Sequence, residues 1–347
     1  MKEAHNFKPV RIAIVGCGMM TEIAHLPAAL KSPFIELVAL VDNVLDRATR
    51  LKRKFGCSAL TVRSFQDVID LIDGAVIVTP NNTHTMLAEI ALQHGVSVLV
   101  QKPMSTSHSD AASVCNLARA KGLVLAVGFQ GRHFPAVKLM KRLITAGFLG
   151  KVHSIHCEFG ARRQYEPLSG YNLNREQAGG GILVAMGSHF LDRMIYWFGD
   201  PGDLAYADDS YGGVESNCKG SMKFGDDIQG SFFFSKTAVL KNTFEINTEH
   251  YLVELPASET EQITLFPRYL PGTKMLIGEK AADPSVDYWQ VELEDFARSI
   301  RLGTPPAADG TEAARSVKLC DALYACRAQL AEPWAWYRNE ALAGIAR

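Results

Sequence analysis

Continuous apolar runs alternate with helical patterns through the first third of the chain, and this alternation constrains the fold more than any other feature. The runs are too apolar to leave one face of a strand in water, and they occupy 11–15, 35–41, 75–79, 96–100 and 123–129. Patterns typical of helices lie between them, at 21–31, 45–55, 65–71, 84–94 and 108–121. Buried strands each followed by a helix predict a doubly wound parallel sheet with helices on both faces.

After residue 128 the alternation gives way to a run of strands. A helix, a strand and a polar loop are expected at 135–146, 151–159 and 162–177, then an apolar helix with a glycine-rich start at 179–198. Strand-like runs separated by turns fill 204–278, and two amphipathic helices close the chain at 288–301 and 311–329. Strands that follow one another with no helix between them predict a largely antiparallel sheet.

The length of the chain indicates more than one domain. At 347 residues it exceeds the size at which a single hydrophobic core usually stops growing. We place the boundary after residue 128. The predicted fold is α/β, with a doubly wound parallel sheet in 1–128 and an α+β domain with a large, mostly antiparallel open sheet in 129–347.

Composition excludes several classes of partner. The net charge is −1 and no basic block occurs, so neither a nucleic acid nor an anionic membrane surface is expected as a partner. No apolar run approaches the length of a membrane span and the N-terminus has no apolar signal core, so a cytoplasmic protein is expected. The seven cysteines form an odd set without a Cys-x-x-Cys pair, which favours reduced thiols and no metal site.

The first apolar run ends in Gly16 and Gly18, and a helix is expected to begin near Met19. Small residues there let the backbone approach a pyrophosphate, and the helix N-terminus supplies free N–H groups and a positive dipole end. Thr21 stands where the dinucleotide fingerprint has Gly or Ala. The alternative is an ordinary glycine turn between a strand and a helix.

Asp42 lies at the end of the second predicted strand, where a carboxylate can accept hydrogen bonds from a ribose diol. Because a carboxylate there repels a 2′-phosphate, NAD is favoured over NADP, although Arg47 lies only a turn away. The alternative role of Asp42 is to cap a helix or form a turn.

Polar residues also follow the third and fourth predicted strands, at Thr79, Pro80, Asn82 and His84 and at Gln101-Lys102-Pro103. Open α/β sheets bind ligands at the carboxyl ends of their strands. Lys102 comes directly after an apolar strand, where desolvation or a neighbouring cation can lower the pKa of a lysine. The alternative is a solvated lysine at a strand end.

Ordered motifs along nearly the whole chain, from Arg11 to about Gln329, resemble the Gfo/Idh/MocA oxidoreductases, a family that includes glucose–fructose oxidoreductase and inositol dehydrogenase. The motifs are Gly16-Cys-Gly18 with His25 and Pro27, Asp42, Thr79-Pro80 with His84, Gln101-Lys102-Pro103 in place of Glu-Lys-Pro, Gly128-Phe129 with Arg132, and Gly179-Gly180-Gly181 followed by Gly187, His189 and Asp192. The resemblance implies that residues 1–128 form an NAD(P)-binding Rossmann domain and 129–347 a substrate-binding and oligomerisation domain.

The resemblance also implies roles for single residues. Lys102 would lie between nicotinamide and substrate, with His189 as the acid/base. The implied cofactor-binding residues are Gly16, Gly18, Met19, Met20, Asp42, Thr79, Pro80, Asn82, His84, Gln101 and Lys102. The implied substrate-binding residues are Arg132, Arg162, Tyr171, Met186 and His189.

Two positions depart from the family pattern. Gln101 replaces a glutamate and removes a charge that would tune Lys102. Ala185 replaces an aspartate four residues before His189, and alanine can neither transfer a proton nor orient an imidazole. Asp192 can meet His189 on one helix face, but the family has an acid there as well.

Several basic and aromatic residues can face a substrate. Arginines would suit phosphate or carboxylate groups, as in a nucleotide-linked sugar, and the alternative for each is a solvated loop residue. These residues are Arg132, Arg162, Arg163, Tyr165, Tyr171 and Arg175.

The sequence therefore predicts an NAD(P)-dependent oxidoreductase that transfers a hydride between nicotinamide and a sugar, cyclitol or nucleotide-linked ketosugar. Two alternatives stay open: a non-catalytic regulator that binds a dinucleotide or sugar, and an NAD-dependent glycoside hydrolase of the same family. The run 231–235 places bulky apolar side chains on both faces of a strand, so a homodimer or homotetramer through the C-terminal sheet is also expected.

Overall fold

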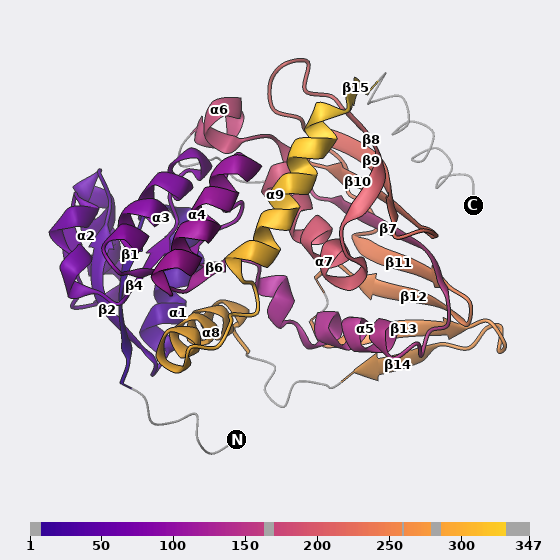
Figure 1. The fold of residues 1–347 in the computed structure, drawn as a ribbon, viewed down its shortest axis with the longest axis horizontal. Helices are drawn as coiled ribbons and strands as arrows, with labels where there is room; N and C mark the ends of the chain where they lie inside the picture. The colour runs from indigo at the N-terminus through magenta and orange to yellow at the C-terminus, as the bar shows by residue number, and fades with distance from the viewer. Residues whose placement is uncertain (1–7, 163–169, 259, 279–285, 331–347) are drawn as a thin grey trace. The chain divides into compact units, whose positions relative to one another are not determined.

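The computed structural model describes residues 8–162, 170–258, 260–278 and 286–330. The chain divides into two compact units, each built on its own sheet (Figure 1). Unit 1 comprises Met1–His133 and Ala282–Val317, and unit 2 comprises Phe134–Ala281 and Lys318–Arg347.

Unit 1 contains a six-stranded sheet in the order β3-β2-β1-β4-β5-β6, with every neighbouring pair parallel. The order reverses beside β1, because the chain first adds β2 and β3 on one side and then crosses to β4 on the other. The predicted doubly wound parallel sheet is thus confirmed. Its strands are β1 Val10–Val15, β2 Ile35–Val41, β3 Leu60–Val62, β4 Gly74–Ile77, β5 Ser97–Val100 and β6 Leu125–Val127.

Helices cover both faces of this sheet. One face packs against α1 Leu26–Lys31, α2 Leu45–Phe55 and α8 Tyr288–Leu302, and the other against α3 His84–Gln93 and α4 His108–Lys121. The helix predicted at 65–71 is wrong: the chain forms two single 3₁₀ turns there, Phe65–Asp67 and Ile69–Leu71, each stabilised by few backbone hydrogen bonds.

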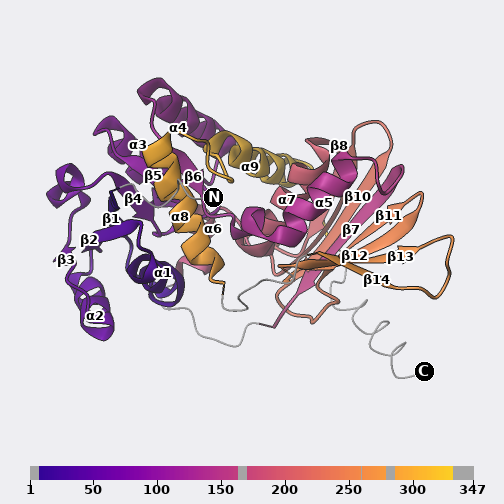
Figure 2. The same cartoon turned by 90° about the horizontal axis from the view of Figure 1, so that it is seen from below.

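Residues 286–317 pack in unit 1 although they were expected within the domain 129–347. The physical reason is α8, which lies beside α1 (Figure 2) and buries Leu293 and Phe296 against the sheet. Gly74 of β4 has no side chain at the place where the Phe296 ring lies, and a Cβ there would be 3.0 Å from a ring carbon. The assignment of separate functions to 1–128 and 129–347 stays a prediction.

Unit 2 contains a nine-stranded sheet in the order β14-β13-β12-β11-β7-β10-β9-β8-β15. Its pairs are antiparallel except β7 with β10 and β8 with β15, so the predicted mostly antiparallel sheet is confirmed. The strands are β7 Val152–Gly160, β8 Pro201–Asp208, β9 Asn217–Phe224, β10 Ile228–Ser235, β11 Thr243–Thr248, β12 Tyr251–Pro256, β13 Gln262–Pro267, β14 Met275–Gly278 and β15 Arg327–Gln329. The helix expected at 311–329 is α9 Gly310–Ala325, and β15 follows it.

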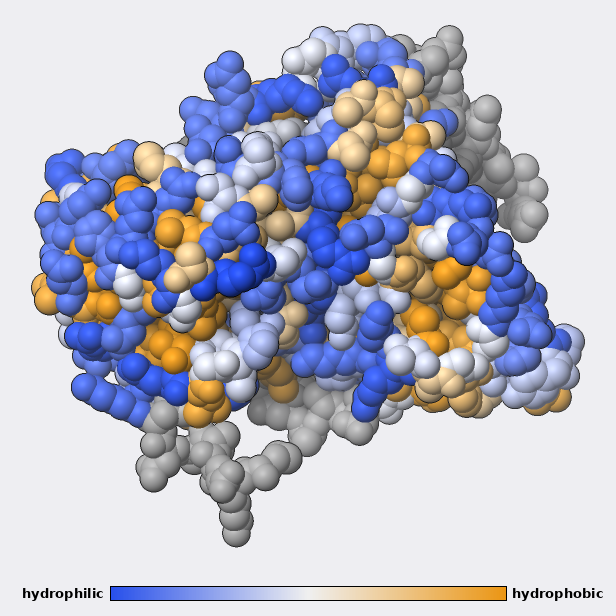
Figure 3. All heavy atoms as spheres, in the orientation of Figure 1, coloured by the Kyte–Doolittle hydropathy of each residue, from blue (hydrophilic) through white to orange (hydrophobic). Residues whose placement is uncertain are grey.

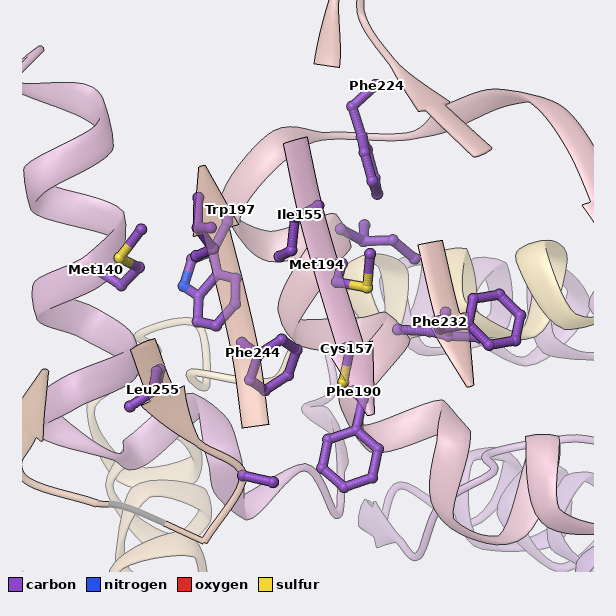
Figure 4. Close-up of a cluster of buried hydrophobic side chains, with 14 of the residues drawn as sticks. Met140, Ile155, Cys157, Phe190, Met194, Trp197, Phe224, Phe232, Phe244 and Leu255 are labelled. Atoms are coloured by element: carbon purple, nitrogen blue, oxygen red, sulfur yellow. The ribbon is translucent and has the colours of Figure 1, made fainter. Parts of the chain in front are cut away.

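Aromatic side chains form the core on one face of the unit 2 sheet (Figure 4), where α5 Pro135–Thr145 and α7 Ser188–Phe198 cover it. The Trp197 ring packs edge-on against Phe244, with centroids 5.0 Å apart, and its indole N–H donates to the carbonyl oxygen of Val137 (3.0 Å). These contacts fix α7 against both the sheet and α5.

The other face of the unit 2 sheet carries apolar side chains as well. Phe233 of β10, expected to need a cover there, is already only 5% exposed. The apolar side chains that alternate away from the core on β12–β14 are Leu252, Phe266 and Leu276, the last 58% exposed. Figure 3, in the orientation of Figure 1, shows the side on which α9 lies, where hydrophobic residues form separate groups bounded by hydrophilic ones. Within the described ranges, no helix combines the length and apolarity needed to cross a bilayer.

Candidate functional site

The glycine turn after β1 has the geometry of a backbone cradle. Gly16 adopts φ +99°, and a Cβ there would lie 2.6 Å from the carbonyl oxygen of Val78. At Gly18, by contrast, a Cβ would meet no heavy atom of the described chain within 4 Å. Open space beside a glycine at the start of a helix fits the close approach of a pyrophosphate.

Thr21 does not weaken this turn. Its side chain is fully buried, and its hydroxyl donates to the carbonyl oxygen of Gly16 (2.5 Å). The hydrogen bond replaces the close helix packing that Gly or Ala gives in the fingerprint. Thr21 opens a π-helical segment, Thr21–His25, that leads into α1. Met19 and Met20, half-buried, lie between the turn and this segment.

The carboxylate of Asp42 connects the end of β2 to the glycine turn. The N–H of Cys17 donates to Oδ2 (2.8 Å), and the N–H of Val44 donates to Oδ1 (2.8 Å). Asp42 therefore does form a local turn, as the alternative held. Each carboxylate oxygen can accept a further hydrogen bond, so these two contacts leave Asp42 with acceptors for a ribose diol. The guanidinium of Arg47 forms an ion pair with Asp42 and lies 3.9 Å from Oδ1.

His84 joins the loops that follow β4 and β5. Its ring nitrogens lie 2.8 Å from the carbonyl oxygens of Pro103 and Thr79. Burial lowers the pKa of His84, and the two carbonyl partners only partly oppose this effect. His84 thus holds Thr79 and the segment after Lys102 in place. Pro80 and Asn82, between these two strands, are exposed.

Lys102 is half-buried directly after β5, at the same edge of the sheet as the glycine turn and Asp42. The side chain of the preceding residue, Gln101, lies where a Cβ of Gly128 would be. Its Nε2 is buried and has no hydrogen-bond partner among the residues that the structure describes. A buried donor without an acceptor is costly unless a ligand supplies one.

The glycines of unit 2 serve a different purpose. A Cβ at Gly180 would overlap the Tyr324 hydroxyl, and a Cβ at Gly181 would overlap the backbone of Glu215. The space beside these glycines is filled by the chain itself. Sequence reasoning missed Glu215, and no local pattern marks it, because its partners lie far away in the sequence.

Met186 and His189 lie on the helical segment that follows these glycines. The segment is π-helical over Leu183–Gly187 and continues as α7. Met186 and His189 are both half-buried, as is Ala185, while Asp192 is buried. No acid precedes His189 on this segment.

The predicted basic residues are divided between the units. Arg132 belongs to unit 1 and is only 3% exposed, which excludes the solvated-loop alternative for it. In unit 2, Arg162 donates to the carbonyl oxygen of Thr237 (3.3 Å), and Tyr171 is half-buried in the 3₁₀ turn Gly170–Leu173. The Arg175 guanidinium lies 4.7 Å from the centre of the Tyr324 ring. Arg163 and Tyr165 lie outside the described residues.

Both parts of the chain match models of one protein family. Residues 10–129 match the Gfo/Idh/MocA model described as an oxidoreductase family with an NAD-binding Rossmann fold, and residues 137–252 match the Gfo/Idh/MocA C-terminal domain. D-glucoside 3-dehydrogenase of Escherichia coli K12 is 30% identical over 208 residues, which are 58% of this chain and 57% of that protein. The match thus spans little more than half the length of that relative.

Two further proteins resemble the chain over most of its length. The rhizopine catabolism protein MocA of Rhizobium meliloti is 25% identical over 331 residues, 90% of this chain and 93% of that protein. The crystal structure of a 3-ketoreductase from Actinomadura kijaniata, in complex with NADP and TDP-benzene, matches with a TM-score of 0.81 at 19% identity. The match covers 94% of this chain and 100% of that one, and it shows a shared fold.

Proposed function

The chain belongs to the Gfo/Idh/MocA oxidoreductase family, and we propose that it is an NAD(P)-dependent dehydrogenase or reductase acting on a sugar, cyclitol or nucleotide-linked ketosugar. One observation carries the proposal: a glycine turn with open space at Gly18, tied to the Asp42 carboxylate, shares one sheet edge with Lys102. A nicotinamide cofactor supplies a ring carbon that accepts or returns a hydride when it is bound.

The residues of unit 1 would hold the cofactor. The backbone from Gly16 to Met20 would bind the pyrophosphate, and Asp42 the ribose diol. Thr79, Pro80, Asn82 and His84 would shape the edge beside it, and the unpaired Nε2 of Gln101 would donate a hydrogen bond. We propose NAD as the preferred dinucleotide, because the Asp42 carboxylate repels a 2′-phosphate, although the Arg47 guanidinium lies 3.9 Å from Oδ1.

Lys102 and His189 would carry the proton chemistry. During oxidation of an alcohol, the imidazole of His189 takes the hydroxyl proton as the carbonyl forms, and the Lys102 ammonium stabilises the developing negative charge on that oxygen. During reduction, His189 returns the proton to the oxygen. Neither step needs an acid at position 185, provided that the imidazole is held in place by its surroundings.

The names of the relatives narrow the substrate class. The Escherichia coli relative is a glucoside 3-dehydrogenase and the Actinomadura protein a 3-ketoreductase. We therefore propose that the chain oxidises or reduces C3 of a hexose ring. Arg162 and Tyr171 would bind the remainder of the substrate, and Met186 would contact its apolar side.

A substrate screen tests the proposal. NAD+ and NADP+ are added separately to glycosides and cyclitols, and the gain of the reduced nicotinamide absorbance is followed. NADH and NADPH are added separately to 3-ketosugars or their nucleotide-linked forms, and the loss of that absorbance is followed. Lys102→Met should leave NADH affinity unchanged and lower kcat about a thousandfold. Turnover of glycosides without a net change in that absorbance would instead support the NAD-dependent glycoside hydrolase. Binding of NADH without any turnover would support the non-catalytic regulator.

We also propose a cytoplasmic homodimer or homotetramer. All seven cysteines are free thiols, which suits a reducing compartment. The outward side chains of Leu252, Phe266 and Leu276 give the unit 2 sheet an apolar area for a second copy. Light scattering at micromolar concentration measures the mass, and a strictly monomeric mass would remove the oligomer.

A further inference from the structure

A buried carboxylate holds the start of the segment that carries Met186 and His189. Glu215 lies between β8 and β9 and is fully buried. Its Oε1 accepts hydrogen bonds from the N–H groups of Gly181 (2.9 Å) and Leu183 (3.0 Å), and its backbone oxygen accepts from Ile182 (2.9 Å). The first N–H groups of a helix have no partner within the helix, so Glu215 supplies the acceptors that they need.

Tyr324 of α9 completes this arrangement. Its hydroxyl donates to the same Oε1 of Glu215 (2.8 Å), and its ring packs beneath the Arg175 guanidinium. The hydroxyl occupies the space that a side chain at Gly180 would need. We refer to Glu215 and Tyr324 together as the clamp. The clamp explains why the chain has glycine at both 180 and 181.

The segment held by the clamp is a π-helical turn, fixed at both ends. The clamp binds its start, and Gly187 at its end packs so closely on Phe234 that a Cβ there would lie 2.7 Å from the ring. A π-turn rotates the residues that follow it relative to a regular α-helix. Met186 lies inside this turn and His189 just beyond it, so the position of both side chains depends on how the turn is held.

We infer that Glu215 and Tyr324 are positioning residues, which set the π-turn and thereby present Met186 and His189 to the substrate. The catalytic part of this inference rests on the proposed function, whereas the clamp is a property of unit 2 alone. A negative charge at a helix N-terminus is favourable. The other carboxylate oxygen, Oε2, has no hydrogen-bond partner in the described part of the chain, so the loss of one donor to Oε1 is not compensated there.

The chain offers a matched pair of variants for the test. Tyr324→Phe removes the hydroxyl that binds Glu215 and keeps the ring. Tyr206→Phe is the control, because Tyr206 is also a buried tyrosine, packs edge-on against Tyr324 at 5.7 Å, and does not hydrogen-bond to Glu215. Glu215→Gln is a second probe that keeps the side-chain shape and replaces one carboxylate oxygen by an amide NH2 group, which donates and cannot accept hydrogen bonds.

Hydrogen exchange measures the clamp directly. We expect the amides of 181–187 to exchange about tenfold faster in Tyr324→Phe and Glu215→Gln, and at the wild-type rate in Tyr206→Phe. The NMR signal of His189, assigned with His189→Asn, should shift in the two probe variants only. Circular dichroism confirms that each variant is folded.

Kinetics then tests the positioning role. In both probe variants kcat for the sugar should fall about tenfold while the Kd of NADH is unchanged, because unit 1 binds the cofactor. Wild-type exchange in Tyr324→Phe, or equal changes in Tyr206→Phe, would overturn the clamp. Altered exchange with wild-type kcat would overturn the positioning role. If the wild-type enzyme turns over no substrate, the proposed function fails, while exchange and the His189 signal still decide the inference.

Discussion

The two glycine turns of the molecule resemble each other in sequence but differ in what lies beside them. Each precedes a π-helical segment that leads into an α-helix, Thr21–His25 in unit 1 and Leu183–Gly187 in unit 2. Each is also bound by a carboxylate from elsewhere in its unit, Asp42 or Glu215. Beside Gly18 the described chain leaves open space, whereas Glu215 fills the space beside Gly181. A glycine before a helix therefore indicates a ligand cradle only where the chain does not fill the gap.

The first way to break this comparison is Gly181→Ala, which has the largest expected effect. The new Cβ would overlap the Glu215 backbone, which cannot move without breaking its hydrogen bond from Ile182. We expect a loss of about 3 kcal/mol in the free energy of unfolding, measured by urea denaturation. Gly18→Ala is the matched control and should leave this free energy nearly unchanged. Equal stability of the two variants would contradict a filled turn in unit 2.

The second test measures the affinity for NADH instead of the free energy of unfolding. In Gly18→Ala the methyl group would occupy the space that the pyrophosphate needs, so the Kd of NADH should rise about tenfold. Fluorescence of bound NADH measures the Kd. The control must be a glycine that an alanine can replace without backbone strain, which excludes Gly147, because it adopts φ +67°. Gly202 is suitable, since a Cβ there also meets nothing within 4 Å and the residue lies in unit 2. An unchanged Kd in Gly18→Ala would show that this gap is not the cradle.

Local signals predicted the helices that have strong boundaries, and long-range packing explains the failures. The bounds of α2 and α4 were predicted correctly because Gly56 and Gly122 end them in the left-handed conformation. Glu215 could not be found in this way, because its contacts join distant parts of the sequence. The return of α8 to unit 1 depends on the fit of Phe296 against Gly74, which no local pattern reveals.

The site residues that lie at strand ends could be predicted from the sequence. The residues whose side chains bind backbone groups of neighbouring loops were harder to predict. The positions of Gly16, Asp42 and Lys102 at one sheet edge follow from the parallel topology. His84 was expected to bind the cofactor, but both of its ring nitrogens contact carbonyl oxygens of the loops around it. A histidine next to a site and a histidine that supports it have the same appearance in the sequence.

The stability of the two units should respond differently to acid, and this effect is expected to be of intermediate size. Burial would raise the pKa of Asp73, but hydrogen bonds from Arg11 and Arg301 outweigh it and lower that pKa to about 2. The ion pairs join β1 to α8 through Asp73, and the stability that they contribute is fully present above about pH 4 and lost as the pH falls toward 2. Burial raises the pKa of Glu215, so its effect on stability has the opposite sign.

We therefore expect acid to loosen unit 1 before unit 2. Hydrogen exchange between pH 4 and pH 2, read at Val10–Val15 and at Leu183–Gly187, compares the two. Asp73→Asn should remove most of the pH dependence at β1 while lowering its stability at neutral pH. Loss of protection at Leu183–Gly187 first would reverse the expected order.

The smallest expected effect comes from removing the hydrogen bond between Thr21 and the glycine turn of unit 1. Thr21 binds the Gly16 carbonyl oxygen from its own helix, so Thr21→Val should cost about 1 kcal/mol in unfolding free energy and weaken NADH binding severalfold. Thr248→Val, which removes a buried hydroxyl bound to the carbonyl oxygen of Tyr251 in unit 2, is the control for loss of a threonine hydroxyl. If both variants weaken NADH binding equally, Thr21 has no special role in the turn. If only Thr21→Val does, the open turn of unit 1 depends on the Thr21 hydroxyl as well as on the Asp42 carboxylate, whereas the filled turn of unit 2 depends on Glu215.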